Sequence, residues 1–451
     1  MITHNYSIKR STTKNRIGRL KCISLFLFLL VTGFAGAQNL DTVTVTEPHG
    51  KLYGMTFGDL DYKGNADNLN RGVNQYSGYP VNTTLAQFRR IYLGYIYNIS
   101  PRFTAELILA AESDYQSGVL GQTSNGDLLA DNKFTTYVKY ANLRYKNIWK
   151  GSDLVFGQVN GPAYGINGRN AQTSEEIWGY RSIEKTVSDI RGTNCFDMGA
   201  ELQGWFDRKA NFGYDLMVGN GTQAKPATTQ YKWFYGDVYA KFFDKRLLFD
   251  IYQDYDRMNW GVYVAGVKPG TESPGGPWYH DRNTTKFFAA WTTPKITVGF
   301  EGFTTTILGD VRILGKDGNY YYATTQALAG SFFVRGRILS DHSGNAKLGF
   351  FARFDNFDPS KNLNNIVNNP NTKSYIPLTA AYDPTTKEQF VVAGLDYTPF
   401  RNVHIMPNFW MDTYTSSITQ TLANEGMYAN ITNNKGTDVV WRLTFYYIYG
   451  K

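Results

Sequence analysis

The chain has 451 residues, enough for one large domain or two or three ordinary ones, and 16% of them are aromatic and 19% charged. Beyond residue 37, no apolar run approaches the roughly eighteen residues that indicate a membrane-spanning helix. The formal net charge is +8, but six of the 46 basic residues lie in the first 37 positions, which carry no acid. The rest of the chain is nearly neutral, so its charge gives no indication of nucleic-acid binding.

The first 37 residues have the organisation of a secretory signal peptide. Lys and Arg residues between Lys9 and Lys21 precede an apolar stretch from Cys22 to Phe34, and Ala35-Gly36-Ala37 then gives the small-x-small pattern that signal peptidase accepts. We therefore expect residues 1–37 to be cleaved, residues 38–50 to form a short N-terminal segment and residues 51–451 to form the folded domain. Since Cys22 leaves with the leader, Cys195 is alone and no internal disulfide can form.

Alternating polar and apolar residues predict about sixteen strands in the remaining chain. Most are longer than the strands of soluble sheets, which have about 5–6 residues, and they fit the roughly 9–11 residues of a tilted membrane strand. In chain order they are residues 51–59, 87–98, 103–112, 135–146, 153–160, 196–206, 210–219, 232–243, 247–258, 284–293, 295–308, 323–339, 347–357, 387–398, 403–414 and 438–449.

The connections between these strands alternate in length along the whole chain. The short ones are residues 99–102, 147–152, 207–209, 244–246, 294, 341–344 and 399–402. The long ones, mostly polar and rich in Asn, Gly and Thr, are residues 60–85, 113–134, 161–195, 220–231, 259–283, 309–322, 358–386 and 415–437. This alternation predicts an all-β, antiparallel transmembrane β-barrel of about 16 strands with tight periplasmic turns and long external loops. A soluble sandwich or a propeller has no reason to alternate in this way.

Side-chain alternation within the strands indicates which face meets lipid. In the last strand Trp441, Leu443 and Tyr447 share one face, whereas Arg442 and Thr444 share the other. Aromatic residues gather at the strand ends, as expected where a ring sits between membrane and water: Tyr95, Tyr97, Trp205, Phe206, Phe242, Phe243, Tyr446, Tyr447 and Tyr449.

Three places fit the pattern less well. Pro407 lies within a strand of a barrel that has no edge, so we expect a β-bulge there. Residues 323–339 are longer than a membrane span requires and are expected to project outward. The pair Arg89 and Arg90 is expected to place one cation on each face of its strand, with one of them at the membrane interface.

A closed barrel of this size is too wide for side chains to fill and leaves an aqueous lumen. The third long connection, residues 161–195, is the longest and is the candidate for narrowing that lumen. An inserted loop with opposed acids and bases would create a transverse field and a size limit. The expected constriction residues are Glu175, Glu176, Arg181, Glu184, Lys185, Asp189 and Arg191. The alternative is a solvated external loop.

Strand residues of both signs are expected to face the lumen. Strand alternation places Lys241, Lys286, Asp197, Asp237, Asp254, Glu301 and Asp412 there, together with a lumen-wall set of Arg335, Arg337, Arg353, Asp355, Arg442 and Glu201. Acids and bases occur in similar number, which also fits simple solvation of a polar wall. We expect no catalytic residue, no cofactor and no metal site, because no His or Cys cluster is present.

Five short stretches carry a family resemblance: residues 88–94, which include the paired arginines, 154–162, 180–182, 352–359, and 394–399 with 402–403. In this order they resemble the porin family of the phosphate-selective porins O and P and its wider porin-like relatives. The resemblance implies a sixteen-stranded barrel, often trimeric, with its third loop folded inward. Phosphate selectivity needs a ladder of Lys and Arg in the lumen, and the third loop has as many acids as bases. The final strand also departs from the family pattern, because Gly450-Lys451 follows Tyr449.

The expected function is that of an outer-membrane porin, which lets small hydrophilic solutes or ions diffuse passively. Its expected partners are outer-membrane lipids, these solutes and two further copies of the chain in a homotrimer, without nucleic acid. A structural or adhesive barrel without a conducting pore is the main alternative. A barrel enzyme is less favoured, because none of His49, His280, His342 and His404 sits beside a nucleophile motif. A secreted soluble β-protein and an energy-coupled transporter are the remaining alternatives.

Overall fold

The computed structural model describes residues 47–450, with gaps at 69–75, 77–78, 113–135, 165–186, 188–195, 228–230, 260–278, 319, 343, 362–371, 378–385, 417–419, 423–426 and 430–433. The expected signal peptide lies outside the described residues. The first strand begins at His49, slightly before the expected domain start at residue 51. No helix within the described ranges is long and apolar enough to cross a membrane.

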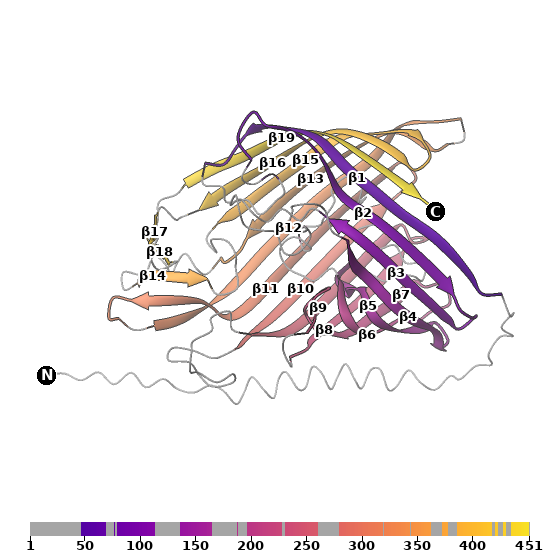
Figure 1. The fold of residues 1–451 in the computed structure, drawn as a ribbon, viewed down its shortest axis with the longest axis horizontal. Helices are drawn as coiled ribbons and strands as arrows, with labels where there is room; N and C mark the ends of the chain where they lie inside the picture. The colour runs from indigo at the N-terminus through magenta and orange to yellow at the C-terminus, as the bar shows by residue number, and fades with distance from the viewer. Residues whose placement is uncertain are drawn as a thin grey trace. The chain divides into compact units, whose positions relative to one another are not determined.

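Sixteen strands form one closed ring, as the sequence predicted. They are β1 (His49–Asn65), β2 (Thr84–Asn98), β3 (Phe103–Glu112), β4 (Tyr137–Trp149), β5 (Ser152–Asn160), β6 (Phe196–Trp205), β7 (Phe212–Gly219), β8 (Trp233–Phe242), β9 (Leu247–Asn259), β10 (Tyr279–Thr292), β11 (Ile296–Gly315), β12 (Tyr320–Ser340), β13 (Ala346–Asp358), β15 (Lys387–Phe400), β16 (Val403–Ser416) and β19 (Asn434–Tyr449). Each pairs antiparallel with its neighbour in the chain. The ring closes where β1 pairs with β19, beginning at Gly54 opposite Tyr449 (Figure 1).

Short turns and long connections alternate around the ring, which confirms the sequence pattern. The β8–β9 turn contains Phe243, Asp244 and Lys245, all with positive φ, and the β15–β16 turn contains Asn402 at φ 68. Residues with positive φ are characteristic of tight turns. Because the start of β1 pairs with the end of β19, both lie at the short-turn end of the barrel.

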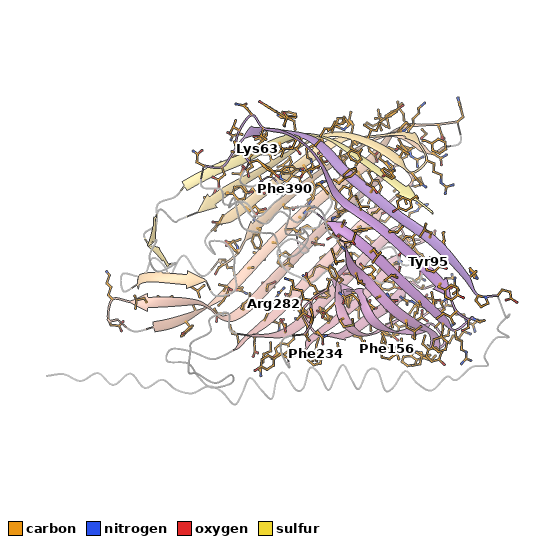
Figure 2. All side chains as sticks on the ribbon, viewed as in Figure 1. Lys63, Tyr95, Phe156, Phe234, Arg282 and Phe390 are labelled. Carbon is orange, nitrogen blue, oxygen red and sulfur yellow. The ribbon has the colours of Figure 1, made fainter. Side chains whose placement is uncertain are left out.

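The outer surface of the ring is apolar. Large hydrophobic side chains are exposed on nearly every strand, among them Leu93, Tyr95, Phe156, Phe234, Ile251, Phe300, Phe332, Trp441 and Leu443; Tyr95, Phe156 and Phe234 are labelled in Figure 2. Residues of alternate parity are buried, such as Arg442 and Thr444 in β19. A water-soluble sheet exposes polar groups, so an apolar outer face with a polar inner face is the layout of a membrane-spanning barrel.

Exposed aromatic residues mark the short-turn end, as expected. Phe206 is 69% exposed, Phe243 67% and Phe400 74%, while Tyr95 and Tyr97 stack at 6.2 Å between ring centroids. Tyr446 differs from the expectation, because its side chain is buried and contacts Phe57 and His404 inside the ring.

Strands β11 and β12 extend beyond their neighbours at the long-loop end, which confirms the projection expected for residues 323–339. Their pairing continues to Leu314 opposite Tyr320 after a register shift between Ile307 and Val311. Short strands lie beside this extension: β14 (Thr372–Pro377) pairs with β11, and β18 (Met427–Ala429) pairs with β14 and β17 (Gln420–Leu422) (Figure 1).

The bulge expected at Pro407 is absent. The register of β15 with β16 is the same on both sides of it, with Gly394 opposite Asn408 and Tyr397 opposite Ile405. Proline lacks a backbone N–H, and the two intervening residue pairs drop out of the ladder while the register of the antiparallel pair is unchanged. On its other side Pro407 remains opposite Leu443.

A bulge occurs instead in the strand that carries the paired arginines. Phe57 pairs with Arg90 and Gly58 pairs with Phe88, so Arg89 is the extra residue on β2. Both Arg89 and Arg90 are buried, whereas Phe88 is exposed on the outer face. The expectation of one arginine on each face was therefore wrong, because a bulge lets two consecutive side chains point to the same side.

Candidate functional site: the barrel interior

The inner face of the ring carries most of the buried charged side chains. Four of the predicted wall residues, Arg353, Asp355, Arg442 and Glu201, are buried there. Arg335 and Arg337 are partly exposed and line a cavity of about 740 Å³ at the short-turn end, together with Asp396 and His404. The strands thus place all six residues inside the ring, although at different depths.

An arginine–aromatic cluster occupies one side of the interior. The guanidinium of Arg442 lies 4.7 Å from the ring centre of Trp410, and Arg353 lies 5.3 Å from that of Phe390. The two rings contact each other edge to face at 4.5 Å. Such stacking suits arginine, whose flat and weakly hydrated cation lies well on aromatic faces. We call Arg89, Arg353, Arg442, Phe390 and Trp410 the arginine–aromatic cluster.

Carboxylates hold two of the three arginines of this cluster in place. Arg89 Nε lies 2.6 Å from Asp59 Oδ2, and both side chains are almost fully buried. Arg353 Nε donates to Asp355 Oδ1 at 2.8 Å. Arg442 instead donates from Nε to Asn408 Oδ1 at 2.7 Å. Two of the three arginine charges are therefore balanced by adjacent acids.

The first long connection enters the barrel interior, and no sequence pattern had indicated this. Tyr76, in the segment between β1 and β2, is 1% exposed and donates a hydrogen bond to Asp59 at 3.0 Å. Its hydroxyl also accepts one from Arg442 Nη1 at 3.0 Å, and its ring packs edge to face on Trp410. Lys63 Nζ donates to the Tyr76 carbonyl at 2.7 Å. This part of the loop is therefore fastened to the arginine–aromatic cluster.

The third long connection also lies against the inner face wherever the structure describes it. The short helix η1 (Pro162–Tyr164) follows β5, and Ala163 is fully buried among residues of β7, β8 and β9. Lys286 donates to the Ala163 carbonyl. Further along the loop, Val187 packs on inward-facing Phe303 and Phe357. The inward third loop predicted from the sequence is thus seen at both of these points.

The expected constriction residues Glu175, Glu176, Arg181, Glu184, Lys185, Asp189 and Arg191 lie outside the described residues. Their position in the lumen stays a prediction.

The interior is more acidic than the sequence analysis expected. Among the described residues, buried acids clearly outnumber buried bases, and Asp59, Asp61, Asp215 and Asp250 were not assigned to the lumen. Asp215 lies on the same face as Met217 and Asp250 on the same face as Tyr252, so strand alternation carried the signal for both. The assumption of similar numbers of acids and bases was wrong.

His404 is the histidine nearest to a hydrolase arrangement within the described ranges. Its Nδ1 lies 2.7 Å from Asp396 Oδ1 and 3.1 Å from Thr398 Oγ1. A catalytic histidine meets its acid through one ring nitrogen and its nucleophile through the other, so this geometry does not fit a triad. Within the same ranges, no group of three or more His, Cys, Asp or Glu side chains could hold a metal ion.

Comparison with known proteins identifies the fold. No protein-family description and no curated protein sequence matches the chain. Solved structures do match. The outer membrane channel DcaP of Acinetobacter baumannii aligns with a TM-score of 0.55 and 11% identity over 89% of this chain and 97% of that one. An anion-selective porin from Comamonas acidovorans aligns with a TM-score of 0.50 and 9% identity over 89% of this chain and 100% of that one.

A complex of Salmonella typhi OmpF with daunomycin aligns equally well, with a TM-score of 0.50 and 9% identity over 89% of this chain and 97% of that one. At such low identity these likenesses establish the fold alone. The chain shares the closed β-barrel architecture of outer-membrane porins.

Proposed function

We propose that the chain is an outer-membrane porin that lets small hydrophilic solutes or ions diffuse passively. The observation that carries the proposal is the closed ring of sixteen strands with an apolar outer face and a charged inner face. A barrel of this width encloses water rather than a packed core. The fold likeness to DcaP, named as an outer membrane channel, and to a porin named as anion-selective supports the same function.

The signal peptide supports export to the outer membrane of a Gram-negative bacterium. Cleavage after Ala37 would leave a short segment before β1. Both ends of the ring then lie on the periplasmic side, with the long connections outside. Lipid would cover the apolar belt.

The third loop would set the size limit of the pore. Its described parts rest on two separate stretches of the inner wall, at Ala163 beside β8 and at Val187 beside β11. The charged residues between them, from Glu175 to Lys185, would then cross the lumen. We also propose a homotrimer, on the basis of the family resemblance; crosslinking in native membranes tests it.

A structural or adhesive barrel is the competing function. The buried position of Tyr76 favours a structural barrel, because this side chain occupies interior space that a solute would otherwise use. The two functions differ in whether the folded barrel conducts.

Single-channel recording tests the proposal. The chain without residues 1–37 is refolded in detergent, checked by the slower gel migration that follows heating, and added to a planar lipid bilayer in KCl. We expect stepwise, long-lived increases in current, because a water-filled barrel conducts ions. Folded protein that inserts into vesicles but gives no steps would contradict the porin and favour the structural barrel.

A further inference from the structure

Four acidic side chains form a row across β6, β7, β8 and β9 on the inner face of the barrel. They are Glu201, Asp215, Asp237 and Asp250, and none is more than 4% exposed. Asp215 and Asp237 are direct partners in the pairing of β7 with β8. Directly opposed residues have Cβ atoms about 4.5–5.5 Å apart, and like charges in this position are destabilising. We call these four residues the carboxylate row.

The strand register continues the row on both sides of this central pair. Gln203 is opposite Asp215, so Glu201 lies diagonally across from that aspartate and within hydrogen-bonding reach of it. Asp250 lies diagonally across from Asp237, and these two carboxyl groups are also within hydrogen-bonding reach. Acid therefore contacts acid over four consecutive strands.

Most oxygens of the row lack donors, although Asp215 Oδ2 accepts a hydrogen bond from Gln203 Nε2 at 3.2 Å. Among the described residues, none donates a hydrogen bond to Glu201 Oε1, Asp215 Oδ1, Asp250 Oδ1 or either carboxylate oxygen of Asp237. Burying a carboxylate without a partner is costly, so either a bound proton or a cation from outside these residues must compensate the charge.

Other buried acids on the same part of the inner face do have hydrogen-bond donors from the protein. Asp197 accepts hydrogen bonds from the backbone N–H of Gly221 at 2.6 Å and from the Tyr235 hydroxyl at 2.9 Å. Asp254 accepts from the Tyr252 hydroxyl at 2.7 Å and from the Thr284 N–H at 2.9 Å. The carboxylate row differs from these structurally satisfied acids.

Two cations adjoin the row, one at each end. Lys286 Nζ lies 3.9 Å from Asp250 Oδ1 and is also bound to the carbonyl of Ala163. Arg144 lies near Glu201 but pairs with Asp153 at 3.2 Å. Lys286 also interacts electrostatically with Asp237, but two cations do not balance four carboxylates, so the row keeps an excess of negative charge.

The other side of the ring is organised differently. In the order of strands, β19 and β1 lie across the barrel from β8 and β9. With the adjacent β2 they carry Arg442, Asp59 and Arg89. On that side acidic and basic side chains lie close to each other, as in the ion pair of Asp59 with Arg89. An ion crossing the interior would therefore meet a nearly neutral wall on one side and a negative wall on the other.

We propose that the carboxylate row is a cation-selective subsite of the pore, where small metal cations supply the charge that the protein leaves uncompensated. The inference rests on the proposed function, because ions must enter the barrel to reach the row. As the described residues form no chelating group, the cations are held by charge, largely through their hydration water. Weak, multi-site binding of this kind allows an ion both to enter and to leave.

Reversal potentials across a KCl gradient test the subsite in refolded protein. We expect the wild-type channel to favour K⁺ over Cl⁻, and Asp237→Asn to lower the permeability ratio by about threefold, because one fixed charge leaves a low-dielectric wall. Combining it with Asp215→Asn should bring the ratio close to unity. Asp244→Asn is the matched control: it removes the same charge from the exposed β8–β9 turn and should leave the ratio unchanged.

The possible outcomes distinguish failure of the cation-selective subsite from failure of the porin function. Channels that conduct but favour Cl⁻, or that keep their ratio in Asp237→Asn, overturn the carboxylate row and leave the porin intact. A folded barrel without current overturns both. If Asp237→Asn does not fold, Asp250→Asn at the end of the same row gives the measurement, and an unchanged ratio there also overturns the inference.

Discussion

Arg89 shows how one residue can change the chemistry of a pore wall. As the extra residue of the β2 bulge it points inward beside Arg90, and its side chain is neutralised by Asp59. The Asp59 carboxylate also accepts a hydrogen bond from Tyr76, so one buried acid joins strand β1, strand β2 and the first loop. Buried ion-paired residues such as Asp59 and Arg89 therefore stabilise the barrel as well as line its interior.

Asp59→Ala should destabilise the barrel by about 3 kcal/mol, because it leaves Arg89 buried without its ion-pair partner. Urea unfolding in lipid vesicles, followed by tryptophan fluorescence, measures the change. The double variant Asp59→Ala with Arg89→Met removes both charges and should regain much of the loss. Equal stability of Asp59→Ala and wild type would show that the pair has no energetic role.

At the scale of elements, the connections shape the interior that the strands enclose. The described part of the first loop is fastened at Tyr76, and the third loop rests on the inner face at Ala163 and Val187. Loops that fold inward narrow a barrel without changing the number of its strands. The conductance should therefore depend on loop side chains as well as on the wall.

Tyr76→Ala should raise the single-channel conductance by tens of per cent, on the order expected when one large ring leaves a constricted pore. The control is Tyr62→Ala, which removes the same ring from the outer face, where Tyr62 is exposed. The two variants are compared in the same bilayers and salt. A conductance for Tyr76→Ala no larger than that of the control would mean that this loop does not narrow the ion path.

At the scale of the whole barrel, closure between β1 and β19 decides whether the sheet has edges. Strand edges in lipid would leave backbone groups without hydrogen bonds, so the seam must form. Gly54 lies at this seam beneath the ring of Tyr449, where a Cβ would overlap that ring and the carbonyl oxygen of Tyr92. Gly64, in the same strand, has its nearest neighbour at 3.6 Å from such a Cβ, in the indole of Trp441.

Gly54→Ala should therefore destabilise the folded barrel by about 2 kcal/mol, within the range for overpacking, while Gly64→Ala is tolerated. The fraction of heat-modifiable, folded protein after refolding at increasing urea concentration measures both. Similar curves for the two variants would show that the seam adapts to an added methyl group.

The sequence by itself determined the ring. Strand lengths, the alternation of short and long connections and the side-chain period are local properties. All sixteen strands overlap their expected ranges, although several are longer, and β11 ends at Gly315 rather than at residue 308. Inward placement of Arg353, Asp355, Arg442 and Glu201 followed from the same period. Asp215 and Asp250 were within reach of that reasoning as well, since Asp215 shares its face with buried Met217 and Asp250 lies between exposed Phe249 and Ile251.

Only the tertiary structure decided which charged side chains face the interior, which of them are paired and where the loops contact the inner wall. A bulge shifts the inward–outward alternation of side chains by one residue. Whether Arg89 points inward therefore depends on how β2 pairs with β1. The entry of Tyr76 into the interior depends on contacts with residues as distant in sequence as Arg442. The carboxylate row exists because the register brings Asp215 opposite Asp237, and register is a property of two strands together.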